Sequence, residues 1–82
     1  MNFDKESDDY CYTVARMNIK KYRKQLGITS QELADRSELT YQFLKNLQSE
    51  KAVVRPRLDS LSRIAKALKI NLRQLFDDLE EN

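Results

Sequence analysis

The chain has 82 residues and a net charge of +2, with 34% charged and 40% apolar residues, so it has room for one small domain with a modest core. Its single cysteine excludes an internal disulfide, and the absence of histidine removes the commonest metal ligand and general base. Because no stretch approaches the roughly 18 consecutive apolar residues of a membrane span, and the start lacks the pattern of a signal peptide, we expect a cytoplasmic protein.

The first predicted helix begins at Tyr10 or Thr13 and ends at Leu26. Its apolar residues recur at intervals of four, three and four, which places them on one face of a helix: Ala15, Ile19, Tyr22 and Leu26. Gly27 follows at the position where a left-handed residue commonly ends a helix. The pattern therefore predicts a helix with a glycine stop.

Two short helices are predicted next, joined by a three-residue turn. Thr29-Ser30-Gln31-Glu32 has the form of a capping box and opens a helix over Thr29–Arg36. The turn is Ser37-Glu38-Leu39, and the following helix covers Thr40–Gln48 with Leu44 and Leu47 directed inward. This spacing is that of a helix-turn-helix.

The remaining predicted elements follow a loop that ends at Pro56. A fourth helix over Leu58–Lys69 is expected to bury one apolar face: Leu58, Leu61, Ile64, Ala65 and Leu68. Asn71 and Gln74 open a fifth, short helix that carries Leu72, Leu75 and Phe76, with Leu79 as a further candidate. Since no segment alternates in the manner of a strand, the predicted fold class is all-α with five helices.

Charge is distributed unevenly along the chain. Residues 1–9 hold four acidic side chains and one lysine, and residues 77–82 hold four acidic side chains and no basic one. The 14 basic and five acidic side chains between them give residues 10–76 a net charge of +9. We expect a domain over 10–76 that binds a polyanion, between acidic tails at 1–9 and 77–82. The alternative is a solvated helical surface without such a partner.

Residues 14–76, about three quarters of the chain, resemble the Cro/C1-type (XRE) helix-turn-helix domain of phage repressors and bacterial regulators. The resemblance depends on the ordered set of these residues: Ile19, Tyr22, Arg23 and Gly27, Ile28 to Ala34, Leu39, Thr40, Leu44 and Leu47, and Pro56, Leu61, Ile64 to Leu68, Leu72, Leu75 and Phe76. It implies a five-helix, lambda-repressor-like fold in which the second and third helices form the helix-turn-helix.

The resemblance implies that the third helix lies in the major groove of double-stranded DNA. The candidate base-reading residues on its outer face are Thr40, Tyr41, Gln42, Phe43, Lys45 and Asn46. Glutamine and asparagine can pair with an adenine edge, and threonine and phenylalanine can contact a thymine methyl group. The alternative is an ordinary wet helix face, with Phe43 packed sideways onto the second helix.

A second group of residues is expected to contact DNA phosphates. Ser30 matches the family position at a helix start that meets a phosphate, and the candidates as a group are Arg23, Ser30, Gln31, Lys51, Arg55 and Arg57. The alternative for the loop members is a solvated basic turn.

Three positions depart from the family pattern. Glu38 stands in the turn where the family often has glycine, and a left-handed backbone there would cost about 1 kcal/mol. Glu50 follows the third helix, where its charge would repel phosphate. Gln48 replaces a glutamate that pairs with the arginine of the first helix, so Arg23 keeps an acceptor but loses a charged partner and becomes more available to phosphate.

These observations predict a sequence-specific DNA-binding transcriptional regulator that acts as a repressor on a pseudo-palindromic operator. We expect a weak homodimer through the fifth helix, since Leu72, Leu75, Phe76 and Leu79 offer more apolar surface than docking of that helix needs. The alternative function is a protein–protein interaction module on the same fold, such as an antitoxin or an adaptor. The sequence has no nucleophile–base pair, Gly-rich phosphate loop or metal-ligand cluster, so we expect no enzymatic activity and no cofactor, metal, membrane or small-molecule ligand.

Overall fold

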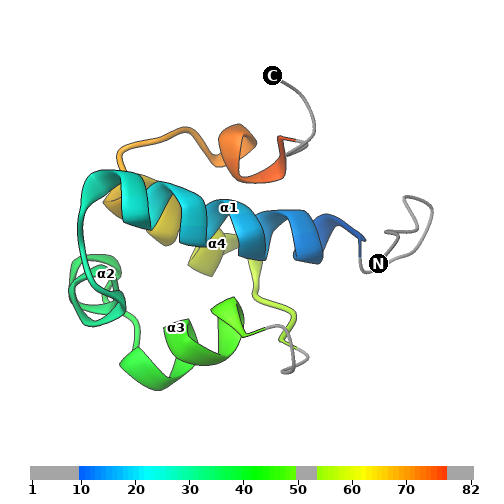
Figure 1. Ribbon diagram of the computed structural model, residues 1–82. Helices are drawn as coiled ribbons and strands as arrows, with labels where there is room; N and C mark the ends of the chain where they lie inside the picture. The colour runs from blue at the N-terminus through cyan, green and yellow to red at the C-terminus, as the bar shows by residue number, and fades with distance from the viewer. Residues whose placement is uncertain (1–9, 50–53, 78–82) are drawn as a thin grey trace.

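The structure is a computed structural model that describes residues 10–49 and 54–77. These residues form four α-helices and one 3-10 helix: α1 (Tyr10–Leu26), α2 (Ser30–Ser37), α3 (Tyr41–Gln48), α4 (Leu58–Ala67) and η1 (Leu72–Phe76). The described residues contain no strand, and the predicted all-α class is confirmed. In Figure 1, α1 crosses the centre of the molecule, with α2 and α3 below it, α4 behind it and η1 above it. The predicted tail at 1–9, most of the tail at 77–82, and Leu79 lie outside the described residues.

The predicted count of five α-helices is wrong at the last element, which is a 3-10 helix of five residues. The N–H of Gln74 donates to Asn71 O at 2.9 Å, three residues back, and the N–H of Asn71 donates to Gln74 Oε1 at 2.8 Å. A segment this short can close more bonds with the three-residue repeat than with the four-residue repeat of an α-helix.

α4 is shorter than predicted, because the chain turns at Lys69. This residue has a left-handed backbone with φ of 62°. The N–H of Ile70 reaches back to Ala65 O at 3.0 Å, which gives the helix end the bonding pattern of a glycine stop without a glycine. The helix therefore ends at Ala67 rather than at Lys69.

In the turn that joins α2 to α3, Glu38 itself adopts the left-handed backbone, and the turn is not adjusted to avoid it. Its φ of 61° and ψ of 38° are left-handed, and its N–H donates to Asp35 O while that of Leu39 donates to Ala34 O at 2.9 Å. At the other end of α2, Thr29 Oγ1 accepts from Glu32 N and Glu32 Oε1 accepts from Thr29 N, so the predicted capping box is present. The bond from the Thr29 N–H favours the carboxylate and lowers the pKa of Glu32.

Opposite substitutions at Glu38 and Gly27, two of the three left-handed positions among the described residues, should have opposite effects on stability. Glu38→Gly should raise the free energy of unfolding by about 0.5–1 kcal/mol, since glycine removes the left-handed strain but enlarges the unfolded ensemble. Gly27→Ala should lower it by about 1 kcal/mol, because Gly27 has φ of 76° although no atom lies within 4 Å of an added Cβ. Urea denaturation of both variants measures the two changes. A loss of stability in Glu38→Gly would show that the left-handed backbone at Glu38 is not strained.

The core lies where α1, α2, α3, α4 and η1 meet. Its fully enclosed large side chains include one from each element: Ile19, Leu33, Leu44, Ile64 and Leu75. Leu58 was predicted to join them, and this prediction is wrong, because 65% of the residue is exposed. Leu58 is the first residue of α4, where it lines an open hollow at the surface instead of joining the core.

Asn18 makes a tertiary link that the sequence patterns did not reveal. The residue is buried on α1, and its Nδ2 donates to Leu75 O and to Asp77 O, each at 2.8 Å. Both carbonyl groups belong to the C-terminal end of η1, where 3-10 helices leave acceptors unsatisfied. A single amide nitrogen thus ties the last element to the first.

Candidate nucleic-acid interface

The described structure contains the predicted helix-turn-helix. α2 ends at Ser37 and α3 begins at Tyr41, so three residues separate the helices. Leu33 of α2 and Leu44 of α3 are both fully buried in the same core, which leaves the opposite face of α3 at the surface. Figure 1 shows α3 at the outer edge of the molecule, separated from η1 by α1.

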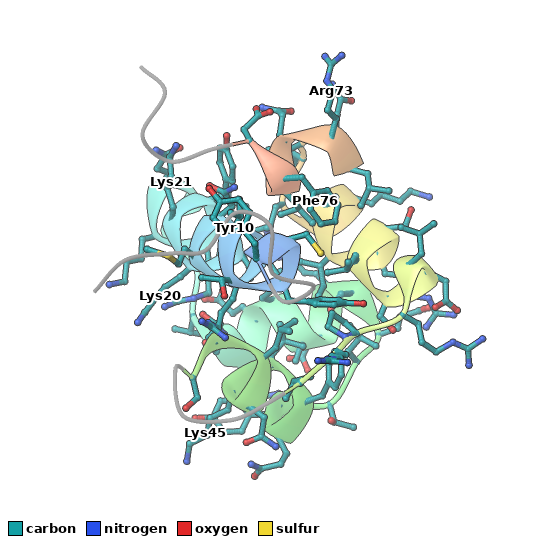
Figure 2. All side chains as sticks on the ribbon, turned by 90° about the vertical axis from the view of Figure 1, so that its right-hand side faces the viewer. Tyr10, Lys20, Lys21, Lys45, Arg73 and Phe76 are labelled. Carbon is teal, nitrogen blue, oxygen red and sulfur yellow. The ribbon has the colours of Figure 1, made fainter. Side chains whose placement is uncertain are left out.

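The outer face of α3 carries most of the predicted base-reading residues. Four of the six are exposed and the other two, Phe43 and Asn46, are half-buried; the exposed ones are Thr40, Tyr41, Gln42 and Lys45. In Figure 2, Lys45 extends from α3 away from the body of the protein. The helix thus presents hydroxyl, amide and ammonium groups on one accessible surface.

Phe43 and Thr40 have structural contacts of their own. Phe43 packs against the hydrophobic core, so it is not freely exposed on the outer face of α3. Thr40 is the N-cap of α3, and its Oγ1 accepts from the Phe43 N–H at 3.1 Å. The Thr40 methyl group and hydroxyl hydrogen are not used by this bond, so capping and contact with DNA are compatible.

Gln42 and Asn46 form a pair on the exposed face of α3. Gln42 Nε2 donates to Asn46 Oδ1 at 3.0 Å, one helical turn away. An amide nitrogen has two hydrogens, so Gln42 keeps one donor and its carbonyl oxygen for another partner. That donor and acceptor are the two groups that an adenine edge requires.

A hydrogen-bonded network joins α1, α2 and α3, and it includes two of the predicted phosphate-contacting residues, Arg23 and Ser30. Arg23 Nε donates to Gln48 Oε1 at 3.0 Å, and Arg23 Nη1 donates to Ile28 O at 2.7 Å. Gln48 Nε2 in turn donates to Ser30 Oγ at 3.0 Å. Arg23 keeps its acceptor as expected, but two of its nitrogens are engaged within the protein. The link from Gln48 to Ser30 was not anticipated, because it requires the relative placement of two helices.

The other predicted phosphate-contacting residues are distributed around α2 and the start of α4. Gln31 is exposed, and its Nε2 donates to Asp35 Oδ1 at 3.0 Å. Arg57 is the N-cap of α4, and its Nε lies 3.8 Å from Asp59 Oδ1 with 87% of the arginine side chain exposed. Arg55 is exposed. Lys51 and Glu50 lie outside the described residues.

The N-terminal part of α4 borders an open hollow of about 720 Å³. Its lining combines three cationic side chains with two apolar ones: Arg57, Arg63 and Lys66, with Leu58 and Leu72. Asp59 also lines the hollow, so the charge there is basic but not uniform. Through Arg63 and Lys66, the hollow continues the basic character of the loop before α4 along the helix itself.

Two other features, a metal site and a membrane-spanning helix, are absent from the part of the chain that the structure describes. No group of three or more cysteine and acidic side chains there is arranged to hold a metal ion. None of the helices in the two described ranges combines the length and apolar character that crossing a bilayer requires.

Comparisons with known proteins agree with this geometry. The family model for the Cro/C1-type HTH DNA-binding domain matches residues 18–81. Among solved structures, the N-terminal DNA binding domain of SinR from Bacillus subtilis superimposes with a TM-score of 0.73, at 23% sequence identity, over 85% of this chain and 99% of that one. A likeness at this identity shows the fold, and no curated protein sequence matches the chain. Since the family model spans most of the chain, the protein belongs to the family of Cro/C1-type helix-turn-helix DNA-binding domains.

Proposed function

We propose that the protein is a sequence-specific transcriptional regulator that inserts α3 into the major groove of an operator. The observation that carries the proposal is the pair of Gln42, which is exposed, and Asn46, which is half-buried, whose amides are joined at 3.0 Å on the outer face of α3. The bond between the two amides fixes the orientation of the Gln42 side chain on the helix, and its remaining donor and acceptor suit an adenine edge. Tyr41 and Lys45 flank the pair on the same face.

Phosphate contacts complete the proposed interface. Ser30 and Gln31 are the first two residues of α2, while Arg55 and Arg57 precede α4, so that donors lie at the start of both helices. Contacts of this kind hold the register of a protein on the duplex without reading sequence. In the proposal Lys51 adds a further cation from the loop. Arg23 contributes by holding Gln48, which in turn donates to Ser30.

The proposed mode of action is repression by occupancy of the operator in the cytoplasm, without catalysis. The DNA-binding unit is residues 10–76, and the acidic segments 1–9 and 77–82 are outside it. A net charge of +9 on the unit favours a polyanion, and the tails oppose non-specific binding through their negative charge. Specific base contacts on α3 then contribute a larger share of the affinity.

We further propose a weak homodimer on a pseudo-palindromic operator, with η1 in the interface. Of the apolar residues in the prediction, Leu75 is fully buried in its own chain and Leu79 lies outside the described residues. Leu72, half-buried, and Phe76, 37% exposed, remain to contact a second copy. Figure 2 shows Phe76 on the side of the molecule that also presents the start of α1.

Sedimentation tests the dimer. The expected result is a concentration-dependent shift toward a dimer in the free protein, or two copies per duplex on the selected operator. Phe76→Ser should reduce the shift in either case, because it removes apolar surface from the contact. A strict monomer both free and on operator DNA would contradict the dimer but leave the DNA-binding proposal intact.

Selection from a pool of random duplexes tests the function itself. The expected result is enrichment of a short motif, bound with an affinity that falls steeply as salt rises, because phosphate contacts release counterions. Binding to duplex DNA without any enriched motif would contradict sequence-specific regulation. If neither enrichment nor salt-dependent DNA binding occurs, the alternative of a protein–protein interaction module is favoured instead.

A further inference from the structure

Arg23 determines which way the side-chain amide of Gln48 faces. A guanidinium group can only donate, so the Gln48 atom at 3.0 Å from Arg23 Nε is the carbonyl oxygen Oε1. The amide nitrogen Nε2 therefore faces the other way, where Leu44 O lies at 2.9 Å and Ser30 Oγ at 3.0 Å. Only 9% of Gln48 is exposed, so water does not easily replace these partners.

The amide orientation in turn determines the direction of the Ser30 hydroxyl. The nitrogen of an amide donates two hydrogens and accepts none. One hydrogen of Gln48 Nε2 is directed to Leu44 O and the other to Ser30 Oγ, so the serine oxygen accepts in this bond. The hydroxyl hydrogen consequently points away from Gln48. Ser30 is only half-buried, which leaves it within reach of a ligand at the surface.

We propose that Gln48 is a positioning residue for DNA binding: by donating to Ser30 Oγ, it keeps the Ser30 hydroxyl as a donor to a DNA phosphate. The inference rests on the proposed function, in which Ser30 contacts the duplex backbone. A phosphate oxygen accepts hydrogen bonds only, so a serine that presented a lone pair would be repelled. A glutamate at position 48 would have that effect, because its carboxylate would take the hydroxyl hydrogen for itself.

The test is a double-mutant cycle with Gln48→Glu and Ser30→Ala, measured as affinity for a random-sequence duplex of about 20 base pairs at about 50 mM salt. Ser30→Ala alone should weaken binding by about tenfold, the usual worth of a hydrogen bond to a charged group. Gln48→Glu should weaken binding by about tenfold more in the wild-type background than in the Ser30→Ala background. The negative charge that the glutamate adds acts in both backgrounds and cancels in the cycle.

Two further measurements separate positioning from a general loss of structure. The salt dependence should be the same for the wild type and Ser30→Ala, because the serine is neutral and releases no counterion. Thermal unfolding of each variant shows whether it is folded at the assay temperature. If Gln48→Glu does not fold, Gln48→Met takes its place in the cycle. Methionine has no amide hydrogen to donate to Ser30 Oγ, so the serine hydroxyl is free to adopt any of three rotamers. Since one of the three remains suitable for the phosphate, the coupling should be about threefold.

Equal losses from the position-48 substitution with and without the Ser30 hydroxyl would overturn the positioning role while leaving DNA binding in place. A wild-type protein that does not bind the duplex at this salt concentration would overturn the proposed function, and the positioning role with it. Coupling of the expected size, with all four proteins folded, supports both.

Discussion

Replacing Asn18 by leucine is expected to lower the free energy of unfolding by about 3 kcal/mol. Asn18 Nδ2 donates to the carbonyl groups of Leu75 and Asp77, and leucine has no donor to replace it. Each carbonyl that loses its partner away from water costs about 1–3 kcal/mol. The bond to Leu75 O is buried and the bond to Asp77 O is half-buried, so the first contributes the larger part. Urea denaturation followed by circular dichroism measures the loss.

Ser37→Ala is the matched control for Asn18→Leu. Ser37 is also buried, and its Oγ donates to Leu33 O at 2.6 Å. These groups lie within one helix, and the neighbouring carbonyl of Ala34, which Ser37 Oγ reaches at 3.3 Å, already accepts from Leu39 N. The substitution should change stability by less than about 0.5 kcal/mol. If the two variants lose the same free energy of unfolding, the bonds from Asn18 to η1 stabilise the fold no more than a hydrogen bond within one helix does.

The contrast between Asn18 and the helix boundaries indicates which parts of the fold can be predicted from the sequence. Gly27 and the capping box of Thr29 and Glu32 mark helix ends through contacts between residues close in the chain, and the structure confirms them. The end of α4 was missed because Lys69, an ordinary residue, adopts the conformation usually given to glycine. The link from Asn18 spans 57 residues, and no local pattern marks it.

The same distinction applies to the candidate interface. The exposed positions of Gln42 and Lys45 follow from helical periodicity once Leu44 and Leu47 are assigned to the core. The exposure of Leu58 could not be predicted from periodicity, because it depends on which neighbouring elements cover the start of α4. Likewise, the sequence suggests that Gln48 meets Arg23, but only the packing of α2 against α3 brings Ser30 to its other side.

The second large effect is expected from Gln42→Ala on the operator obtained by selection. Its amide has one free donor hydrogen and its carbonyl oxygen available, while the other hydrogen remains on Asn46 Oδ1. Loss of a two-bond contact to an adenine edge should weaken operator binding by about 1–3 kcal/mol, or roughly fivefold to 150-fold. Binding to a scrambled duplex should hardly change, because phosphate contacts supply that affinity.

Arg57→Ala is the control that separates reading of bases from contact with the backbone. The arginine is at the start of α4, and 87% of its side chain is exposed beside Asp59 at 3.8 Å, so its removal should leave the core unchanged. Affinity should fall for operator and scrambled duplexes alike, and the slope of log affinity against log salt should decrease by about one. Titrations of both variants on both duplexes across a salt series give the comparison. If Gln42→Ala weakened the two duplexes equally, α3 would contact the backbone rather than the bases, and the proposed division of roles would be wrong.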